Sequence, residues 1–275
     1  MMFHSRLGCS SISFRHQELG TALRTVDDLG FEEIDLGALP GVCNHVPYEL
    51  DGAAVASVSA QVKASGLRVR SVNGDIGDLN RVLDGDGQAA RQRHLDALLT
   101  LSANTGAKAL VLPCGALDHN PVRSVEEDLD TIAAQLIQAR ERAAEFGVEL
   151  WTESLHFLRF CWNLERAGLL ADRLAGSGVG IVMDFSHIVA AGEEPLQYLD
   201  RHRGRITHIH LRDAVPGNIN LSLGNGIADF AGGLKRLAMH GYTGHFSLEL
   251  ETRDVTHDER PAATAKAASF ITDLI

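Results

Sequence analysis

Residues 179–212 read VGIVMDFSHIVAAGEEPLQYLDRHRGRITHIHLR, and this stretch decides the fold. Two short apolar runs, 179–185 and 206–212, flank a stretch that we expect to be helical over about 194–203. A buried strand, a helix and a second buried strand in this order are typical of a unit whose two strands run parallel. The stretch therefore predicts one repeat of a parallel α/β architecture.

The same pattern continues in both directions along the chain. Strands are expected at 6–14, 32–37, 67–74, 108–114, 148–154, 179–185, 206–212 and 245–251. Helices are expected after them, at 18–29, 51–65, 87–105, 124–146, 163–175, 194–203, 229–240 and 258–274. A doubly wound open sheet is the rival fold, but eight repeats without GxGxxG after the first strand favour closure. We predict a single (β/α)8 TIM barrel domain over residues 1–275, a fold that typically takes roughly 250 residues.

Composition and charge limit the class of protein and its partners. The chain of 275 residues is 45% hydrophobic and has a formal net charge of -11. Such an acidic surface repels the phosphates of nucleic acids and anionic membranes, so we expect neither as a partner. No apolar run approaches the roughly 20 residues of a membrane span, and the first residues lack the apolar segment of a signal peptide. The four cysteines form no CxxC pair, so we expect a cytoplasmic protein without a disulfide framework.

Metal-binding residue types stand at the ends of four consecutive predicted strands. The active site of an α/β barrel lies at the C-terminal ends of its strands. There the chain carries Glu153, Asp184, His210 and Glu249. Any one of them alone is typical of a helix cap or a buried core histidine. Three carboxylates gathered at one mouth, however, repel one another unless a cation lies among them, so we predict one bound divalent metal, first Mn²⁺, with Mg²⁺, Co²⁺ or Zn²⁺ as alternatives.

The strand-end motifs resemble those of a known superfamily. They are TES at 152–154, MDFSH at 183–187, HIHLRD at 208–213, GNGIADF at 224–230 and SLELE at 247–251. As a set they resemble the sugar phosphate isomerase/epimerase superfamily, the xylose-isomerase-like TIM barrels. The resemblance implies that the four strand-end residues form one metal quartet. It also implies that the two glutamates of that quartet, Glu153 and Glu249, act as acid and base through a cis-enediolate.

The resemblance also suggests three substrate contacts. His187 would contact a substrate oxygen, and its alternative is an exposed histidine at a helix N-terminus. Arg212 would hold a distal hydroxyl or carboxylate, and its alternative is a rim salt bridge with Asp213. His156 follows Glu153 by three residues, so it either reaches the pocket or is a plain loop residue.

Other polar residues near the predicted site are expected to be structural, or their role stays undecided. His208 is expected to be a buried, hydrogen-bonded histidine one layer below His210, and Glu251 is expected at the rim. Ketose 3-epimerases carry a glutamate six residues after the first metal glutamate, where this chain has Arg159. As a hypothesis, Arg159 favours an acidic or keto-acid substrate. His45 either points into the mouth or lies on its loop.

The predicted function is a divalent-metal-dependent sugar isomerase or epimerase that acts on a keto-sugar or related polyol in carbohydrate metabolism. The alternative is a metal-dependent lyase or dehydratase that acts on an inosose or a 3-oxo-sugar. A catalytically inactive metal-binding subunit is a third reading. Endonuclease IV has the same barrel and quartet, but its further histidines are missing from the strand ends near Asn73 and Cys114. The resemblance leads us to expect a small-molecule substrate and a homodimer or homotetramer.

Overall fold

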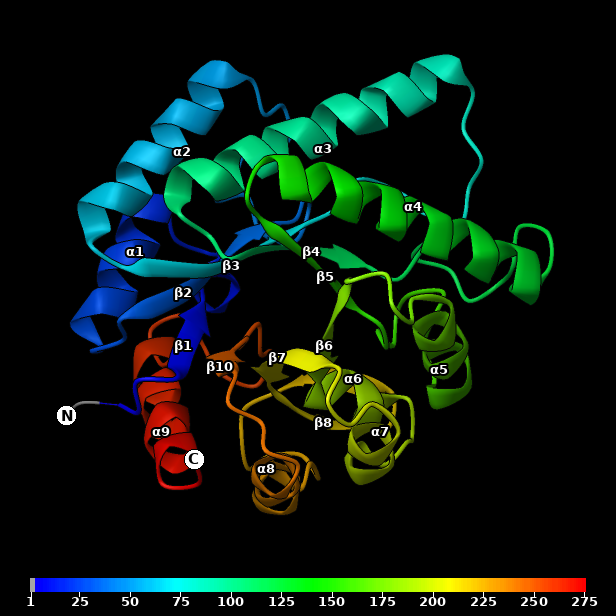
Figure 1. The fold of residues 1–275 in the computed structure, drawn as a ribbon. Coiled ribbons are helices and arrows are strands. Elements are labelled where there is room, and N and C mark those ends of the chain that lie inside the picture. Colours follow the sequence, from blue (N-terminus) through cyan, green and yellow to red (C-terminus); the bar gives the residue numbers. More distant parts are fainter. Residues whose placement is uncertain (1–2) are drawn as a thin grey trace.

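A closed barrel of parallel strands forms the centre of the computed structural model, which describes residues 3–275 (Figure 1). The strands follow one another in the order β1-β10-β7-β6-β5-β4-β3-β2, and β2 pairs with β1 to close the barrel. All neighbouring pairs are parallel. The bounds are β1 Leu7–Ser10, β2 Glu33–Ala38, β3 Arg68–Gly74, β4 Ala109–Pro113, β5 Glu149–Glu153, β6 Gly180–Asp184, β7 Ile206–Leu211 and β10 His245–Leu248. The predicted (β/α)8 TIM barrel is confirmed.

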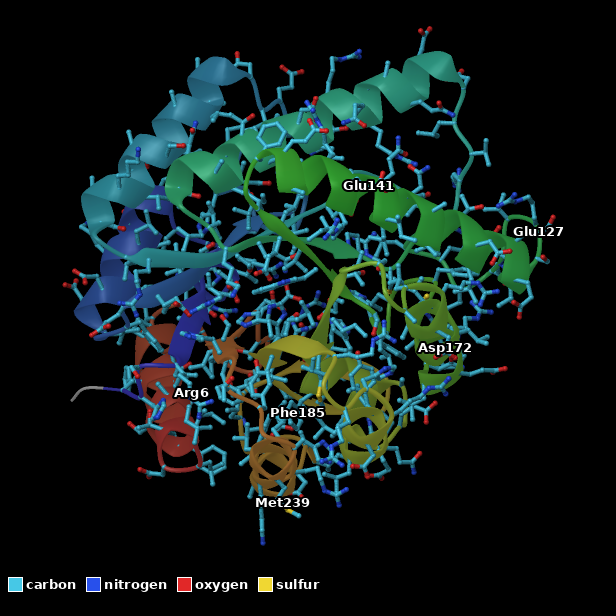
Figure 2. All side chains as sticks on the ribbon, viewed as in Figure 1. Arg6, Glu127, Glu141, Asp172, Phe185 and Met239 are labelled. Atoms are coloured by element: carbon cyan, nitrogen blue, oxygen red, sulfur yellow. The ribbon has the colours of Figure 1, made fainter. Side chains whose placement is uncertain are left out.

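Helices surround the barrel on the outside. Their bounds are α1 Leu19–Asp28, α2 Gly52–Ser65, α3 Gly85–Thr105, α4 Val125–Glu145, α5 Leu164–Arg173, α7 Pro195–Arg201, α8 Phe230–Met239 and α9 Arg260–Thr272. In Figure 1 the last helix, α9, lies beside the first strand, β1, so the two ends of the chain complete one ring. Glu127, Glu141 and Asp172 lie on the outer surface of these helices and are exposed (Figure 2).

Strand alternation separates the outer core from the barrel interior. Along β7, Ile209 and Leu211 join the main hydrophobic core between strands and helices, whereas His208 and His210 are buried on the opposite face. Phe185, labelled in Figure 2, lies in the same core, and its ring contacts that of Phe230 on α8. The interior face carries both kinds of side chain, because Ala109, Val111, Trp151 and Val182 form a separate apolar cluster and Trp151 contacts His208.

The predicted boundaries of the first and last strands are wrong at their C-terminal ends. β1 ends at Ser10, and residues Ser11–Phe14 form a 3-10 helix, η1, because the Ser10 side chain accepts a hydrogen bond from the Ile12 N–H and turns the chain. β10 ends at Leu248, since the Leu250 N–H donates to the Ser13 side chain at 2.8 Å instead of to a neighbouring strand. Both strands therefore stop at the mouth of the barrel.

The expected strict alternation of strand and helix is interrupted after β6. A short helix, α6, spans Phe185–Ala190 and precedes α7. Asp184, the last residue of β6, caps it by accepting the Ser186 N–H at 2.6 Å. The MDFSH motif therefore forms a strand end joined directly to a helical turn.

An antiparallel hairpin, also absent from the prediction, follows β7. It consists of β8 Asp213–Val215 and β9 Asn218–Leu221, and it contacts α6. The Asp213 carboxylate also organises the GNGIADF loop beyond the hairpin. It accepts hydrogen bonds from the backbone N–H groups of Ala214, Gly224, Gly226 and Ala228.

No helix within residues 3–275 combines the length and the apolar character that crossing a lipid bilayer requires.

Candidate metal centre

The structure brings the four strand-end residues together at one mouth of the barrel. Glu153 ends β5, Asp184 ends β6, His210 lies near the end of β7, and Glu249 directly follows β10. These strands are consecutive around the barrel, and all four side chains are buried. Each residue offers one ligand atom, and these atoms lie within 4.8 Å of one another. His210 Nδ1 is 3.7 Å from Glu153 Oε1 and 3.4 Å from Glu249 Oε2.

Burial and close spacing disturb the protonation of this cluster. Burial, together with the charges of Asp184 and Glu249, raises the pKa of Glu153 to about 7. Burial also raises the pKa of Asp184. Burial would also raise the pKa of Glu249. The adjacent His210 imidazole outweighs burial and lowers this pKa to about 2. Three carboxylates at this spacing therefore need a compensating positive charge.

Unpartnered polar atoms mark the same point. Within residues 3–275, the buried atoms Glu153 Oε1 and His210 Nδ1, which lie 3.7 Å apart, have no hydrogen-bond partner. Buried polar atoms are almost always satisfied, and unsatisfied ones indicate a missing ion or water. Carboxylate oxygens and one imidazole nitrogen are donors that suit a divalent cation of the Mn²⁺ type. The residues present thus fit a metal ion.

Arg212 is buried beside the cluster rather than at its rim. Its guanidinium donates to Asp184 Oδ2 at 3.2 Å, to Ser186 Oγ at 3.0 Å and to Glu251 Oε1 at 2.7 Å. Burial opposes the charge, but Asp184 and Glu251 outweigh it and raise the pKa of Arg212. The alternative of a rim pair with Asp213 is wrong, because Asp213 is occupied by the backbone of the following loop.

His187 and His156 form a stacked pair next to the cluster. Their ring centroids are 3.8 Å apart, and His187 is 2% exposed, so the alternative of an exposed helix-terminal His187 is wrong. His187 Nδ1 accepts the Phe157 N–H at 3.2 Å, and Nε2 lies 4.0 Å from Glu153 Oε2. Burial lowers the pKa of His187 well below its ordinary value and that of His156 to about 3. Both rings are therefore neutral near pH 7.

A cavity of about 270 Å³ opens at this cluster, with Glu153 and Glu249 in its wall. It is lined by Ile12, Arg15, Leu39, Pro40, Gly41, Val42, Asn73, Asp75, Val111, Leu112, Pro113, Leu117, Glu153, His156, Leu158, Arg159, His187, Arg212, Ile219, Asn220, Glu249, Glu251 and Arg253. The three proposed substrate contacts are all in this wall. Asn73, which donates to Glu249 Oε1 at 3.3 Å, was not predicted, although its place at the end of β3 is the same signal that identified the quartet.

Arg159 and His45, whose roles the sequence left open, lie in different surroundings. Arg159 lies in the cavity wall, where it pairs with Asp75 Oδ2 at 2.5 Å and donates to the Gly115 carbonyl at 3.0 Å. His45 is buried on its loop, with Nε2 3.1 Å from the Gln17 carbonyl, and it is not among the cavity-lining residues of the described chain. Asp75 thus balances the charge of Arg159, and His45 holds its loop.

Two groups of known proteins are similar to this chain: curated relatives over about half of its length, and solved structures over nearly all of it. Inosose dehydratase from Geobacillus thermodenitrificans (strain NG80-2) is 28% identical over 152 residues, which cover 49% of this chain and 50% of that protein. The chain spans about half the length of the curated relatives it matches.

Two solved structures have the same fold over nearly the whole chain. The 3-keto-D-glucoside 4-epimerase YcjR from E. coli, in its apo form, superposes with a TM-score of 0.75 at 19% identity, covering 98% of this chain and 100% of that one. IolI, solved with a bound zinc atom, superposes with a TM-score of 0.78 at 18% identity, covering 98% and 99%. The family pattern of the xylose isomerase-like TIM barrel matches residues 23–274, and the chain belongs to that family.

Proposed function

We propose that this protein is a divalent-metal-dependent isomerase or epimerase that moves a proton at the carbon beside a sugar carbonyl. The observation that carries the proposal is the arrangement of the quartet around the barrel. Glu153 and Glu249 stand on the outer strands of the arc β5-β6-β7-β10, while Asp184 and His210 stand between them. Two carboxylates therefore flank the point at which the ligand atoms converge.

A divalent cation held by these four side chains would polarise the carbonyl and neighbouring hydroxyl of a substrate and so acidify the C–H bond between them. Glu153 and Glu249 would then exchange the proton. One carboxylate that removes it and a second that returns it on the opposite face invert the carbon, whereas one carboxylate working on a single face gives isomerisation. In both cases the substrate passes through a cis-enediolate.

The remaining cavity residues would hold and orient the substrate. His156 and His187 are neutral and line the wall, so they suit hydroxyl groups. Arg212 already serves Asp184 and Glu251, so its first role is to hold these carboxylates in place. Because Asp75 balances Arg159, the wall gives the acidic-substrate hypothesis no added support, and a small neutral keto-sugar or polyol suits the cavity.

The test is proton exchange with solvent. We expect the protein reconstituted with Mn²⁺ to convert a member of a panel of ketoses, inososes and 3-oxo-sugars in D₂O. The expected product is an isomer of the substrate in which one carbon-bound hydrogen beside the carbonyl is replaced by deuterium. Failure to incorporate deuterium into any panel member, with the metal bound, would contradict the proposal. Comparing neutral ketoses with sugar acids in the same assay tests the Arg159 hypothesis.

A dehydratase or lyase acting on an inosose or a 3-oxo-sugar is the second candidate. The sequence match to inosose dehydratase favours it. Both reactions begin by removing the same proton, but the lyase then expels a group from the next carbon. A product that has lost water or an aglycone would therefore identify the lyase. A product with the molecular formula of the substrate, apart from exchanged deuterium, would identify the isomerase. Tight metal binding without turnover of any compound would point instead to an inactive subunit.

The proposed metal is Mn²⁺, with Mg²⁺, Co²⁺ and Zn²⁺ as alternatives. A donor set rich in carboxylates suits the harder ions, and the zinc atom in IolI supports Zn²⁺ as an alternative. We also propose a homodimer or homotetramer in the cytoplasm. Sedimentation of the purified protein with and without metal checks the oligomeric state.

A further inference from the structure

A buried carboxylate that belongs to no predicted motif lies beneath the quartet. Asp35, on β2, is fully buried. Its Oδ1 accepts a hydrogen bond from Ser71 Oγ at 2.8 Å, and its Oδ2 lies 2.7 Å from His208 Nε2. The expectation that His208 is buried and hydrogen-bonded is confirmed. A buried carboxylate is costly to keep in a protein interior, so its presence needs a reason.

Asp35 also faces the imidazole of the quartet. The same oxygen, Oδ2, is 3.5 Å from His210 Nε2. β2 and β7 are not neighbours in the barrel, so this contact crosses the interior. His208 and His210 meet edge to face, with ring centroids 5.2 Å apart at 90°. His210 is therefore bounded by His208 on one side and by the Asp35 carboxylate on another.

The two nitrogens of His210 face different partners. Nδ1 points towards Glu153 and Glu249, at 3.7 and 3.4 Å, whereas Nε2 points towards Asp35. A neutral imidazole carries one proton, and a neighbouring carboxylate attracts the N–H to its own side. A cation bound to Glu153 and Glu249 would take the lone pair of Nδ1, and the N–H would then stand on Nε2, where it faces Asp35. Metal-binding histidines commonly have such a carboxylate behind them.

We propose that Asp35 is a positioning residue that fixes the orientation of His210 for metal binding, with Ser71 and His208 holding the Asp35 carboxylate in place. This inference rests on the proposed function, because it assumes that the quartet binds a cation. It assigns a purpose to a buried acid, a buried serine and a buried histidine that touch none of the cavity. The alternative interpretation is that Asp35, His208 and His210 together bind a second cation.

The same strand supplies a matched control. Glu33 precedes Asp35 by two residues and so lies on the same face of β2. It is also buried against an imidazole, with Oε1 2.7 Å from His245 Nδ1, and Arg70 donates to it at 2.8 Å. His245 begins the strand that Glu249 follows, so this contact is roughly 13 Å from the quartet at the usual rise per residue.

The experiment measures metal affinity rather than turnover. The full chain, stripped with a chelator, is titrated with Mn²⁺ and with Co²⁺ as wild type, Asp35→Asn and Glu33→Gln. We expect Asp35→Asn to weaken Mn²⁺ binding by about 10- to 100-fold and to change the Co²⁺ absorption spectrum, because the His210 ligand is less well held. Glu33→Gln is expected to lower stability but to leave the affinity and the spectrum unchanged.

Other outcomes separate this inference from the proposed function. Wild-type affinity in folded Asp35→Asn would overturn the positioning role while leaving the metal site intact. Equal losses in both variants would show general destabilisation and overturn it too, as would two cations bound per chain. If wild type binds no cation at all, the proposed function fails as well. Should Asp35→Asn not fold, Ser71→Ala decides: weaker Mn²⁺ binding supports the role, and unchanged binding overturns it.

Discussion

The residues of the quartet differ in how tightly their surroundings restrain them. Asp184 accepts two hydrogen bonds from Ser186, at 2.6 and 2.7 Å, and so is fixed at the start of a helix. Glu153 Oε1 has no hydrogen-bond partner within residues 3–275, and Glu249 Oε1 receives a long bond of 3.3 Å from Asn73. The two glutamates are thus freer to move towards a substrate, which suits proton exchange.

Replacing either glutamate tests whether Glu153 and Glu249 carry out the proton exchange. We expect Glu153→Gln and Glu249→Gln each to slow solvent deuterium incorporation by about 10²- to 10⁴-fold, because a positioned general acid or base contributes that much. Glu149→Gln is the control, since Glu149 stands at the opposite end of β5 from Glu153 and pairs with Lys108. Exchange at the wild-type rate in both glutamine variants would refute the acid–base assignment. Proton NMR of the substrate in D₂O gives the rates.

The buried guanidinium of Arg212 makes a prediction about stability. Arg212→Met leaves Asp184 and Glu251 without their shared partner, so we expect a loss of about 3–5 kcal/mol in the free energy of unfolding. Arg236→Met, which removes an exposed pair with Asp200, should cost at most about 1 kcal/mol. Urea denaturation of the metal-free proteins measures both. Similar small losses in the two variants would mean that Arg212 does not hold these carboxylates.

At the scale of the elements, strands far apart in the sequence are joined by buried polar contacts at both ends of the barrel. Glu33 on β2, Arg70 on β3 and His245 on β10 form one such contact at the N-terminal end. Asp35, Ser71 and His208 form another below the mouth. These contacts fix the relative positions of strands whose backbones do not all pair with one another.

The contact at the N-terminal end predicts a pH dependence of stability. Burial would raise the pKa of Glu33, but hydrogen bonds from His245 and Arg70 outweigh it and lower this pKa below 4.5. A carboxyl with a lowered pKa stabilises the fold above its unfolded pKa and loses that contribution as the pH falls through its folded pKa. Glu33→Gln should therefore be less stable than wild type at pH 7, and the difference should shrink below pH 4.5. A difference that grows on acidification would contradict this account; urea denaturation across pH measures it.

The loop after the hairpin depends on one side chain. Because Asp213 accepts four backbone N–H groups, Asp213→Ala should free the segment 224–228 and lower stability by about 1–3 kcal/mol. Faster amide hydrogen exchange confined to residues near this loop is the expected result. Asp254→Ala, which removes an exposed acceptor of Ser222 and Asn225, is the comparison. Unchanged exchange at 224–228 in Asp213→Ala would rule out this role.

How far the sequence predicts these features depends on the range of the interactions. The quartet could be predicted because each member stands at or beside the C-terminal end of its own strand, and the topology of parallel strands brings those ends together. The role of Asp35 could not be predicted, because it depends on contacts with His208 and His210 across the barrel. The hairpin of residues 213–221 is too short to show a clear alternation. Helix α6 follows its strand without a loop, so no turn residue separates the two.

At the scale of the whole molecule, closure of the barrel makes one cation a link between four strands. β5, β6, β7 and β10 each contribute one ligand, so a bound metal ties together the second half of the barrel. The same closure places the hairpin and the loop after β2 around the cavity. That residues 1–275 form a single domain stays a prediction, and residues 1–2 lie outside the described structure.

Metal binding should therefore stabilise the entire fold. A ligand at about 100 times its Kd stabilises the native state by about 2.7 kcal/mol, so Mn²⁺ should raise the Tm and a chelator should reverse the rise. In His210→Gln, which lacks the imidazole ligand, the rise should be much smaller at the same Mn²⁺ concentration. Thermal unfolding followed by circular dichroism gives the values. Equal rises in wild type and variant would place the stabilising metal elsewhere.

The proposed function depends on one cation that binds among Glu153, Asp184, His210 and Glu249. An anomalous difference map from crystals grown with saturating Mn²⁺ tests it most directly. We expect one strong peak per chain, coordinated by three carboxylates and by Nδ1 of the imidazole. No peak at that position, or a peak held by a different set of residues, would contradict it.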